Sequence, residues 1–247
     1  MGYTIAVAGK GGTGKTTLAA LIVRLIKEKK LGSVLAVDAD PNSNLAEALG
    51  VKVNATIGKI LDEIASSPEK IPSGMPKERF IEYEVQTAIV EGEGFDLLTM
   101  GRPEGPGCYC YVNNVLRNIV DKLIKDYDYV VIDNEAGLEH LSRRTTRRSD
   151  ALVVISDATL VGLRSAKRIN ELARELNIET KKRLLIINRH NEELDKQALK
   201  DTGIDYLGNI PEDKNIAKIS LDGNSLLKLD KKTASLEALR NMGDRIL

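Results

Sequence analysis

The chain has few aromatic residues: it contains no Trp, and Phe, Trp and Tyr together make up 4% of its 247 residues. Hydrophobic residues nevertheless amount to 42%, which is enough for a sizeable core. That core must therefore be built mainly from Ile, Leu, Val and Ala. The same shortage argues against the aromatic stacking platforms that bind single-stranded nucleic acid.

An excess of charge is also absent, because 36 Lys and Arg residues balance 36 Asp and Glu residues. The chain as a whole is therefore not attracted to DNA or to an acidic membrane, and we expect neither as a partner. No apolar run reaches the ~18 residues that span a bilayer. Residues Met1–Ala8 lack the basic region and cleavage site of a signal peptide. Two cysteines do not make a secreted disulfide framework, so we expect a cytoplasmic protein.

β-Branched and aliphatic runs alternate with amphipathic helical patterns along the chain. Several runs are apolar on both faces, as strands of a buried parallel sheet are. The expected strands are Tyr3–Ala8, Ser33–Asp38, Phe95–Met100, Tyr129–Asp133, Ala151–Ser156, Arg183–Asn188 and Tyr206–Ile210. The expected helices are Lys15–Lys30, Asn113–Asp126, Val161–Leu176, Glu192–Lys200 and Thr233–Ile246. The pattern predicts a single α/β domain over residues 1–247, with a doubly wound, mostly parallel sheet of about seven or eight strands and helices on both faces.

Two further segments have weaker patterns. In the less regular region Val51–Gly94, Thr56 is expected to cap a helix over Ile57–Ile64, Ser66–Pro76 is expected to be a loop, and Phe80–Val90 is left unassigned. The C-terminal segment Thr233–Leu247 carries both signs of charge beside one apolar face. It is typical of a helix docked on the domain rather than of a membrane anchor.

A glycine-rich loop follows the first expected strand and precedes the first expected helix. It reads Gly9-Lys10-Gly11-Gly12-Thr13-Gly14-Lys15-Thr16 and fits G-x-x-x-x-G-K-[ST] at every fixed position. Backbone N–H groups of such a loop and the helix N-terminus wrap a phosphate. We expect Lys15 to reach the β- and γ-phosphates and the Thr16 hydroxyl to bind Mg²⁺, with Thr17 beside them in the nucleotide site. The sequence thus predicts a P-loop NTPase.

Lys10, at the front of the loop, is not required by a plain phosphate loop. With it the sequence resembles the deviant Walker A ATPases, the superfamily of MinD, ParA, the nitrogenase iron protein and metal-cluster chaperones. The resemblance implies ATP hydrolysis by a homodimer in which this lysine crosses to the partner's nucleotide. A lysine exposed near phosphate is the simpler alternative.

Carboxylates close two of the expected strands. Asp38 and Asp40 lie on the same side of the chain at the end of the second strand, where ligands bind in α/β sheets. One could bind Mg²⁺ and the other could orient the attacking water, and the resemblance favours Asp40 for the water. An ordinary Asp-Pro-Asn turn is the alternative. Asp133 ends an apolar run in the Walker B manner and is expected to bind Mg²⁺.

The identity of the base rests on the segment after the sixth expected strand. GTPases read guanine with the Asp of N-K-x-D, but here Asn188 and Arg189 are followed by His190 and then Asn191. Because Asn191 stands where that carboxylate would be, adenine is favoured. The Asn188 amide can both donate and accept at an adenine edge. Pro211, after the last strand, resembles the family's adenine-flanking turn, so Asn188, Arg189 and Pro211 are expected nucleotide contacts.

Both cysteines lie in one short segment, Gly105–Tyr111, as Cys108 and Cys110. Thiolates this close suit a soft metal such as Ni²⁺, Zn²⁺ or Cu⁺. One pair supplies two ligands where a closed site takes about four, so a two-fold dimer would complete it. Buried structural thiols or a redox dithiol are the alternatives.

Ala136 and Gly137, after Asp133, are expected to form a flexible second switch near the γ-phosphate. The cysteine pair and the long second-switch segment narrow the resemblance. That segment reads Asp133-Asn134-Glu135-Ala136-Gly137-Leu138-Glu139-His140-Leu141-Ser142-Arg143-Arg144. With the cysteines it is similar to the CooC/AcsF group of nickel-insertion ATPases. The resemblance implies a metallochaperone, with apo carbon monoxide dehydrogenase or acetyl-CoA synthase as client and nickel as cargo, although zinc may occupy the same site.

Other interpretations of the sequence remain open. His140 could be a transient nickel ligand or a surface residue, and the basic cluster Arg143–Arg148 could be a solvated helix face or a docking patch for an acidic client. The whole chain could instead be a ParA/MinD-like positioning ATPase. It could also be an electron-transfer iron protein, but that family takes a cysteine after the second switch, and residues 134–150 contain none.

Overall fold

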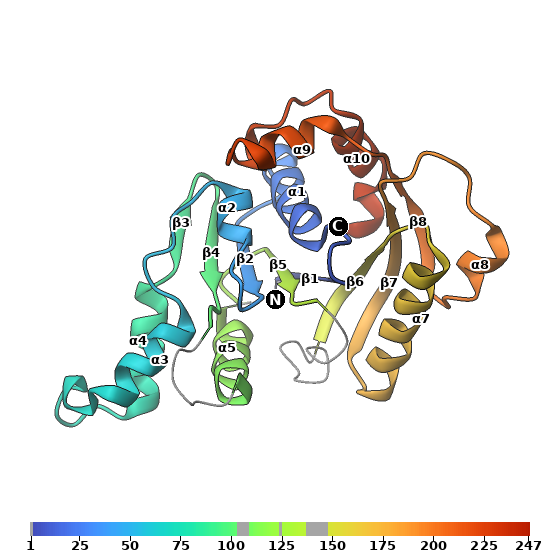
Figure 1. Cartoon of the computed structure of the whole chain (residues 1–247). Coiled ribbons are helices and arrows are strands. Elements are labelled where there is room, and N and C mark those ends of the chain that lie inside the picture. Colours follow the sequence, from blue (N-terminus) through green and yellow to red (C-terminus); the bar gives the residue numbers. More distant parts are fainter. Residues whose placement is uncertain (1, 103–108, 124, 137–147) are drawn as a thin grey trace.

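The computed structural model describes residues 2–102, 109–123, 125–136 and 148–247. Its centre is an eight-stranded sheet in the order β3-β4-β2-β5-β1-β6-β7-β8 (Figure 1). The strands are β1 (Tyr3–Gly9), β2 (Val34–Ala39), β3 (Val90–Gly92), β4 (Phe95–Thr99), β5 (Tyr129–Asn134), β6 (Arg148–Ser156), β7 (Glu179–Asn188) and β8 (Asp205–Ile210). Neighbouring strands are parallel except β3 and β4, which pair antiparallel. The expected mostly parallel sheet is confirmed.

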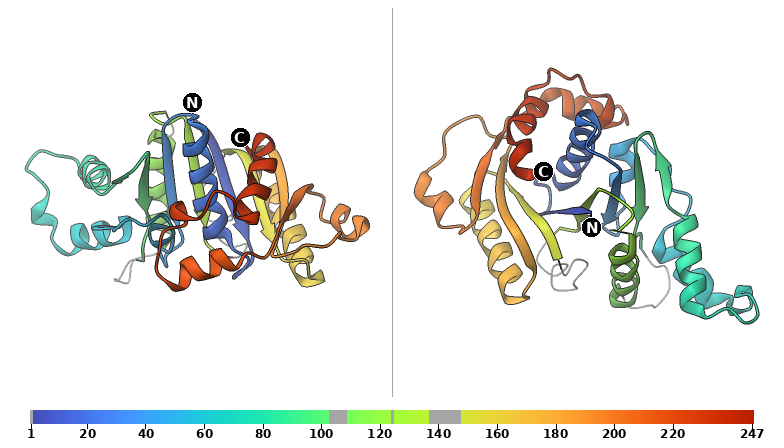
Figure 2. Two further views of the ribbon diagram at one scale, coloured as in Figure 1. Left: turned by 90° about the horizontal axis from the view of Figure 1, so that it is seen from above. Right: turned by 180° about the vertical axis from the view of Figure 1, so that it is seen from behind.

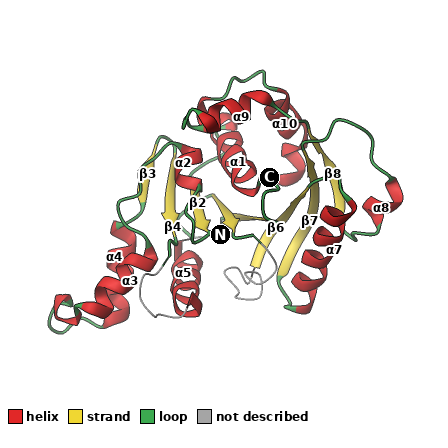
Figure 3. Cartoon of the chain, viewed as in Figure 1, coloured by secondary structure: helices red, strands yellow, loops and turns green. Residues whose placement is uncertain are grey.

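Helices cover both faces of this sheet (Figures 2 and 3). The helices are α1 (Lys15–Lys29), α2 (Leu45–Leu49), α3 (Ile57–Ser66), α4 (Lys77–Thr87), α5 (Tyr109–Leu123), α7 (Leu160–Glu175), α8 (Lys196–Lys200), α9 (Lys214–Leu221) and α10 (Ala234–Ile246), with 3-10 turns η1 (Pro68–Lys70) and η2 (Leu226–Lys228). In Figure 1, α1, α9 and α10 lie on one side of the sheet, and α3, α5 and α7 lie on the other.

The alternation of side chains along each strand produces these two layers. On β1, Ile5 and Val7 belong to the cluster that includes α1 and α10, whereas Ala6 and Ala8 pack in the cluster that includes α7. All four are at most 2% exposed. Strands with apolar residues on both faces are therefore buried on both faces, as the sequence pattern predicts.

Elements that the sequence pattern did not reveal are short or weakly amphipathic. They are β3, α2, α4 and α9. β3 has three residues and pairs with β4 across a two-residue turn, where Gly94 has a φ of 76°. α9 has only eight residues and none of them is buried, so its amphipathic pattern is too short to stand out in the sequence.

Several boundaries also differ. The helix expected over Asn113–Asp126 begins four residues earlier, at Tyr109, so the backbone of Cys110 lies in the first turn of α5 rather than in a loop. The helix expected over Glu192–Lys200 is reduced to α8, whose N-cap is Asp195. The Thr56 cap is confirmed, because its hydroxyl accepts a hydrogen bond from the N–H of Lys59.

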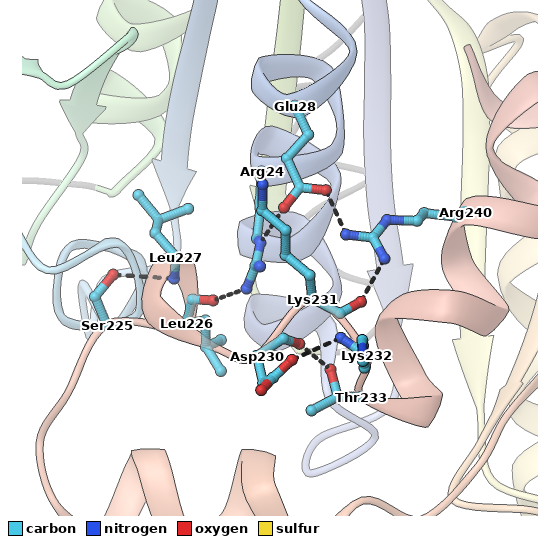
Figure 4. A network of polar contacts seen from close by, with 10 residues as sticks. All are labelled: Arg24, Glu28, Ser225, Leu226, Leu227, Asp230, Lys231, Lys232, Thr233 and Arg240. Atoms are coloured by element: carbon cyan, nitrogen blue, oxygen red, sulfur yellow. Dashed lines mark hydrogen bonds and ion pairs between the residues drawn. The ribbon is translucent and has the colours of Figure 1, made fainter.

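The C-terminal helix is docked, as expected, and polar contacts reinforce it. Leu236, Leu239 and Ile246 of α10 are fully buried. Figure 4 shows the polar network beside them, which joins α1, η2 and α10. Glu28 of α1 accepts hydrogen bonds from Arg24, at 2.9 Å, and from Arg240 of α10, at 2.7 Å. In the described parts of the chain, no helix combines the length and the apolarity needed to cross a bilayer.

Candidate active site

The glycine-rich loop joins the end of β1 to the start of α1, as the motif predicts. A Cβ on Gly9 would lie 2.4 Å from the carbonyl oxygen of Ile155, so β6 leaves no room for a side chain there. Gly12 and Gly14 have φ values of 77° and 98°, in the left-handed region that favours glycine. These three glycines are therefore required by the backbone itself.

The loop curls back on itself and leaves the start of α1 free of a side-chain cap. The Thr13 hydroxyl donates to the Lys10 carbonyl at 2.8 Å, and the Lys15 ammonium lies 3.5 Å from the same oxygen. Gly14 is the N-cap residue and makes no side-chain cap hydrogen bond. The first N–H groups of α1, with the positive end of the helix dipole, form an anion site at the end of the loop.

The two expected aspartates of the neighbouring strands β2 and β5 are brought face to face. The register pairs Asp38 with Asp133, and alternation turns both toward the face covered by α1. Asp133 is 1% exposed, and neither of its carboxylate oxygens meets a hydrogen-bond partner among the described residues. Burial raises the pKa of Asp133 to about 6, although the nearby Thr16 hydroxyl and Lys15 ammonium oppose that shift.

Asp38 is fully buried and differs from Asp133 in having both oxygens occupied. One accepts from the N–H of Asp40 at 3.1 Å, and the other accepts from the N–H of Leu45 at 2.9 Å. Burial is the main reason that the pKa of Asp38 rises to about 7, and the negative charges of Asp133 and Asp40 add to the rise. Asp38 thus ties the end of β2 to the start of α2.

Asp40 is half-buried at the rim of the site. Its side chain accepts hydrogen bonds from the backbone and side-chain N–H groups of Asn42, both at 2.9 Å. This is the turn that the Asp-Pro-Asn sequence permits. The turn and a role in catalysis are therefore compatible, since the turn fixes where the Asp40 carboxylate points.

Negative charge surrounds the buried Lys15 ammonium. Burial lowers the pKa of Lys15, and the carboxylates of Asp133, Asp40 and Glu135 partly offset that shift. Glu135 was not among the expected site residues. Ala136 beside it packs on the phosphate loop, its Cβ 3.6 Å from where a Cβ on Gly11 would stand. The position of Glu135, two residues after Asp133, is the signal that could have revealed it.

A cavity of about 320 Å³ opens beside the loop and α1. Five of the expected nucleotide contacts line it, namely Gly14, Thr17, Asn188, Arg189 and Pro211. Ile216, Ala217 and Ser220 of α9 form another wall, which the sequence did not predict because α9 itself was missed. The Asp213 cap, whose carboxylate accepts from the N–H of Asn215 at 2.9 Å, is the local signal for that helix.

Asn191 does not belong to this cavity. It lines a separate hollow of about 690 Å³ between the loop before α8 and β8, with Leu194 and Tyr206. Asn191 is therefore not among the residues that line the cavity of Asn188, Arg189 and Pro211. The acidic residue Glu212 lines the first cavity. The preference for ATP over GTP stays a prediction.

The expected metal pair is only partly within the described structure. Cys108 lies outside the described residues, and of Cys110 only the backbone in α5 is described. His140 and most of the Arg143–Arg148 cluster also lie outside them. Within the residues that are described, no group of three or more His, Cys, Asp or Glu side chains is arranged to hold a metal ion.

Known proteins share both the sequence and the fold. Residues 4–226 match the family described as the CobQ/CobB/MinD/ParA nucleotide-binding domain. An uncharacterized ATP-binding protein of Methanocaldococcus jannaschii is 45% identical over 98% of both chains. The carbon monoxide dehydrogenase accessory protein CooC of Rhodospirillum rubrum is 31% identical over 95% of both chains. The structure of MinD with Mg-ADP from Pyrococcus horikoshii superposes with a TM-score of 0.74 at 22% identity, covering 100% of this chain and 96% of that one.

Proposed function

Because this chain belongs to the CobQ/CobB/MinD/ParA family of nucleotide-binding domains and is an ATPase of the MinD/ParA type, we propose that it uses ATP to deliver a metal. It is a cytoplasmic metallochaperone that holds nickel at Cys108 and Cys110, shared across a nucleotide-dependent homodimer. Its client is apo carbon monoxide dehydrogenase or acetyl-CoA synthase. The observation that carries this proposal is the cysteine pair in a chain 31% identical to CooC.

The roles of the nucleotide-site residues form part of the proposal. The loop from Gly9 to Thr16 and the start of α1 wrap the phosphates, and Lys15 neutralises the β- and γ-phosphate charge. Lys10, exposed on the loop, reaches the nucleotide of the partner subunit. Asp40 orients the attacking water. The base occupies the cavity of about 320 Å³ beside Pro211 and α9.

The residues around Asp133 fit a hydrated Mg²⁺. Among the residues that the structure describes, neither buried carboxylate oxygen of Asp133 has a hydrogen-bond partner, so a cation or its water ligands would satisfy them. The nearby Thr16 hydroxyl is a hard oxygen ligand of the kind that Mg²⁺ prefers. When bound there, Mg²⁺ would neutralise charge on the phosphate oxygens. Asp38 would contribute mainly by position, because its oxygens already hold the N–H groups of Asp40 and Leu45.

A positioning ATPase is the second candidate, favoured by the likeness of the whole fold to MinD. The helix α10 itself does not offer a membrane-binding face, because its apolar residues Leu236, Leu239 and Ile246 are buried against the domain. Flotation with anionic vesicles and co-sedimentation with DNA, each with ATP, would test this candidate. Anaerobic absorbance near 400 nm would detect the iron–sulfur cluster of an iron-protein-like function.

The decisive experiment is a nickel and zinc titration of the apo protein with determination of its mass, with and without ATP. Binding should saturate at half an equivalent per chain and should promote dimerisation, because only the dimer has four thiolates. Cys108→Ser and Cys110→Ser should lose the metal and keep ATP. Saturation at one equivalent in a strictly monomeric species would overturn the shared site.

The nucleotide half of the proposal has its own test. Lys15→Ala should abolish ATP hydrolysis and strongly weaken ATP binding, while leaving the cysteine pair unaltered. Calorimetry and phosphate release measure the two effects. Near-normal turnover in this variant would remove the loop from the mechanism.

A further inference from the structure

The end of β7 is hydrogen-bonded to the phosphate loop, although the two segments lie far apart in the sequence. The Asn188 amide nitrogen donates to the carbonyl oxygen of Thr13 at 2.8 Å. The Arg189 guanidinium donates to the carbonyl oxygen of Gly12 at 3.0 Å. Two successive carbonyls of the loop are therefore held by Asn188, the last residue of β7, and by Arg189, which follows it.

The chemistry at Asn188 requires an amide. Its nitrogen donates to Thr13, and its oxygen accepts from the N–H of Arg189 at 3.0 Å. A carboxylate would present only acceptors and would face the Thr13 carbonyl unfavourably. A Cβ on Gly14 would stand 2.5 Å from the Asn188 nitrogen, so the loop approaches this amide as closely as its glycine allows.

Arg189 is held in an unfavourable backbone conformation. Its φ of 57° lies in the left-handed region that non-glycine residues seldom adopt. Arg189 comes directly after Asn188 in the chain. In this conformation its side chain reaches the carbonyl oxygen of Gly12. Strain of this kind persists where the surrounding structure fixes it, and it gathers at functional sites.

We propose that Asn188 and Arg189 are positioning residues that hold the phosphate loop open for the phosphates, rather than residues that read the base. This inference rests on the proposed nucleotide site. Because Asn188 and Arg189 hold the carbonyl oxygens of Thr13 and Gly12, these oxygens would stay turned away from a bound phosphate. In the unliganded loop the Thr13 N–H donates to the Lys10 carbonyl at 3.4 Å, a long hydrogen bond that a phosphate oxygen would replace. The effect of these residues on binding is then independent of the base.

The test compares ATP with tripolyphosphate, which has no base. Asn188→Ala and Arg189→Ala should weaken both ligands in parallel, by roughly five-fold for each lost hydrogen bond. Arg189→Ala keeps the backbone strain, since both residues are L-amino acids, so it isolates the side chain. Arg189→Lys, which still donates, should recover part of the affinity. Ile216→Ala, on the α9 wall of the cavity, should weaken ATP and leave tripolyphosphate unchanged.

A second measurement needs no ligand. Amide hydrogen exchange over residues 9–16 of the unliganded protein should be faster in Asn188→Ala and Arg189→Ala than in the wild type. Exchange that stays unchanged, or a loss confined to ATP, would overturn the proposal. If Asn188→Ala does not fold, the exposed Arg189 still decides the question. Failure of the nucleotide site itself would appear separately, as wild-type protein that binds neither ligand.

Discussion

Three aspartates of the site have different surroundings, and these suggest different tasks. Asp38 is fully buried with both oxygens bonded to backbone N–H groups. Asp133 is buried, and its oxygens have no hydrogen-bond partner among the described residues. Asp40 is half-buried and held by Asn42. Of the three, Asp40 combines access to solvent with a fixed carboxylate, which suits a group that orients water.

Asp40→Asn should therefore retain ATP but hydrolyse it about 100-fold more slowly, because the amide orients water poorly and accepts no proton. An ATP-bound dimer should accumulate. Single-turnover hydrolysis with labelled ATP and equilibrium binding measure the two effects, with Lys15→Ala as the comparator that loses binding. An unchanged single-turnover rate would leave Asp133 or backbone groups to orient the water.

At the scale of elements, α1 connects the phosphate loop to the C-terminal segment. Arg24 is only 4% exposed. Its guanidinium donates to the Leu226 carbonyl of η2 at 3.0 Å and to the carboxylate of Glu28. Arg240 of α10 also donates to the Lys231 carbonyl (Figure 4). The network thus fixes the segment that follows α9, and α9 forms one wall of the cavity.

Glu28→Gln should destabilise the protein, because it leaves the buried Arg24 and the half-buried Arg240 without their common counter-ion. We expect the free energy of unfolding to fall by about 1–3 kcal/mol at neutral pH. Thermal or urea denaturation measures the change. A loss of stability below a few tenths of a kcal/mol would show that this network contributes little.

The same substitution should alter the dependence of stability on pH. Burial alone would raise the pKa of Glu28, but hydrogen bonds from Arg240 and Arg24 outweigh burial and hold that pKa below its ordinary value. A carboxyl whose pKa is depressed on folding contributes its stability above the pKa of the unfolded chain, and loses it as the pH falls through the folded pKa. The difference between wild type and Glu28→Gln should therefore shrink in acid.

A matched control lies on the same two helices. Lys29 of α1 and Asp244 of α10 form an ion pair at 2.5 Å, but the Asp244 side chain is 90% exposed. Exposed pairs of this kind contribute little to stability. Asp244→Asn should therefore leave the denaturation midpoint at neutral pH unchanged, in contrast to Glu28→Gln.

For the whole molecule, the proposed dimer depends on Lys10. The residue is exposed on the loop, while Lys15 is buried beside Asp133. Two lysines of one motif therefore face different surroundings, one toward the interior and one outward. An outward lysine beside phosphate can neutralise a nucleotide bound to a second copy of the chain.

Lys10→Ala should abolish the ATP-dependent dimer and change ATP affinity by only a few-fold. The measurement is sedimentation velocity with ATP in the Asp40→Asn background, which prevents turnover. Asp40→Asn should sediment as a dimer, and the double variant should sediment as a monomer. A dimer that persists in the double variant would show that Lys10 does not join the two subunits.

Features that depend on neighbouring residues could be predicted from the sequence. The glycines and Lys15 of the phosphate loop, the apolar strands buried on both faces, the Thr56 cap and the aspartates that end β2 and β5 all follow from local spacing and alternation. The helices α2 and α9 were missed because their patterns extend over only five and eight residues.

The contacts between distant segments could be found only in the folded chain. The tertiary structure placed Asn188, 175 residues from Thr13, on the phosphate loop, and it placed Asn191 beside a different cavity. In the described structure the carboxylate oxygens of Asp133 have no hydrogen-bond partner, whereas both carboxylate oxygens of Asp38 accept hydrogen bonds. The physical reason is that a hydrogen bond between remote residues depends on strand order and register, which are set by packing the whole sheet and leave no mark in the residues on either side.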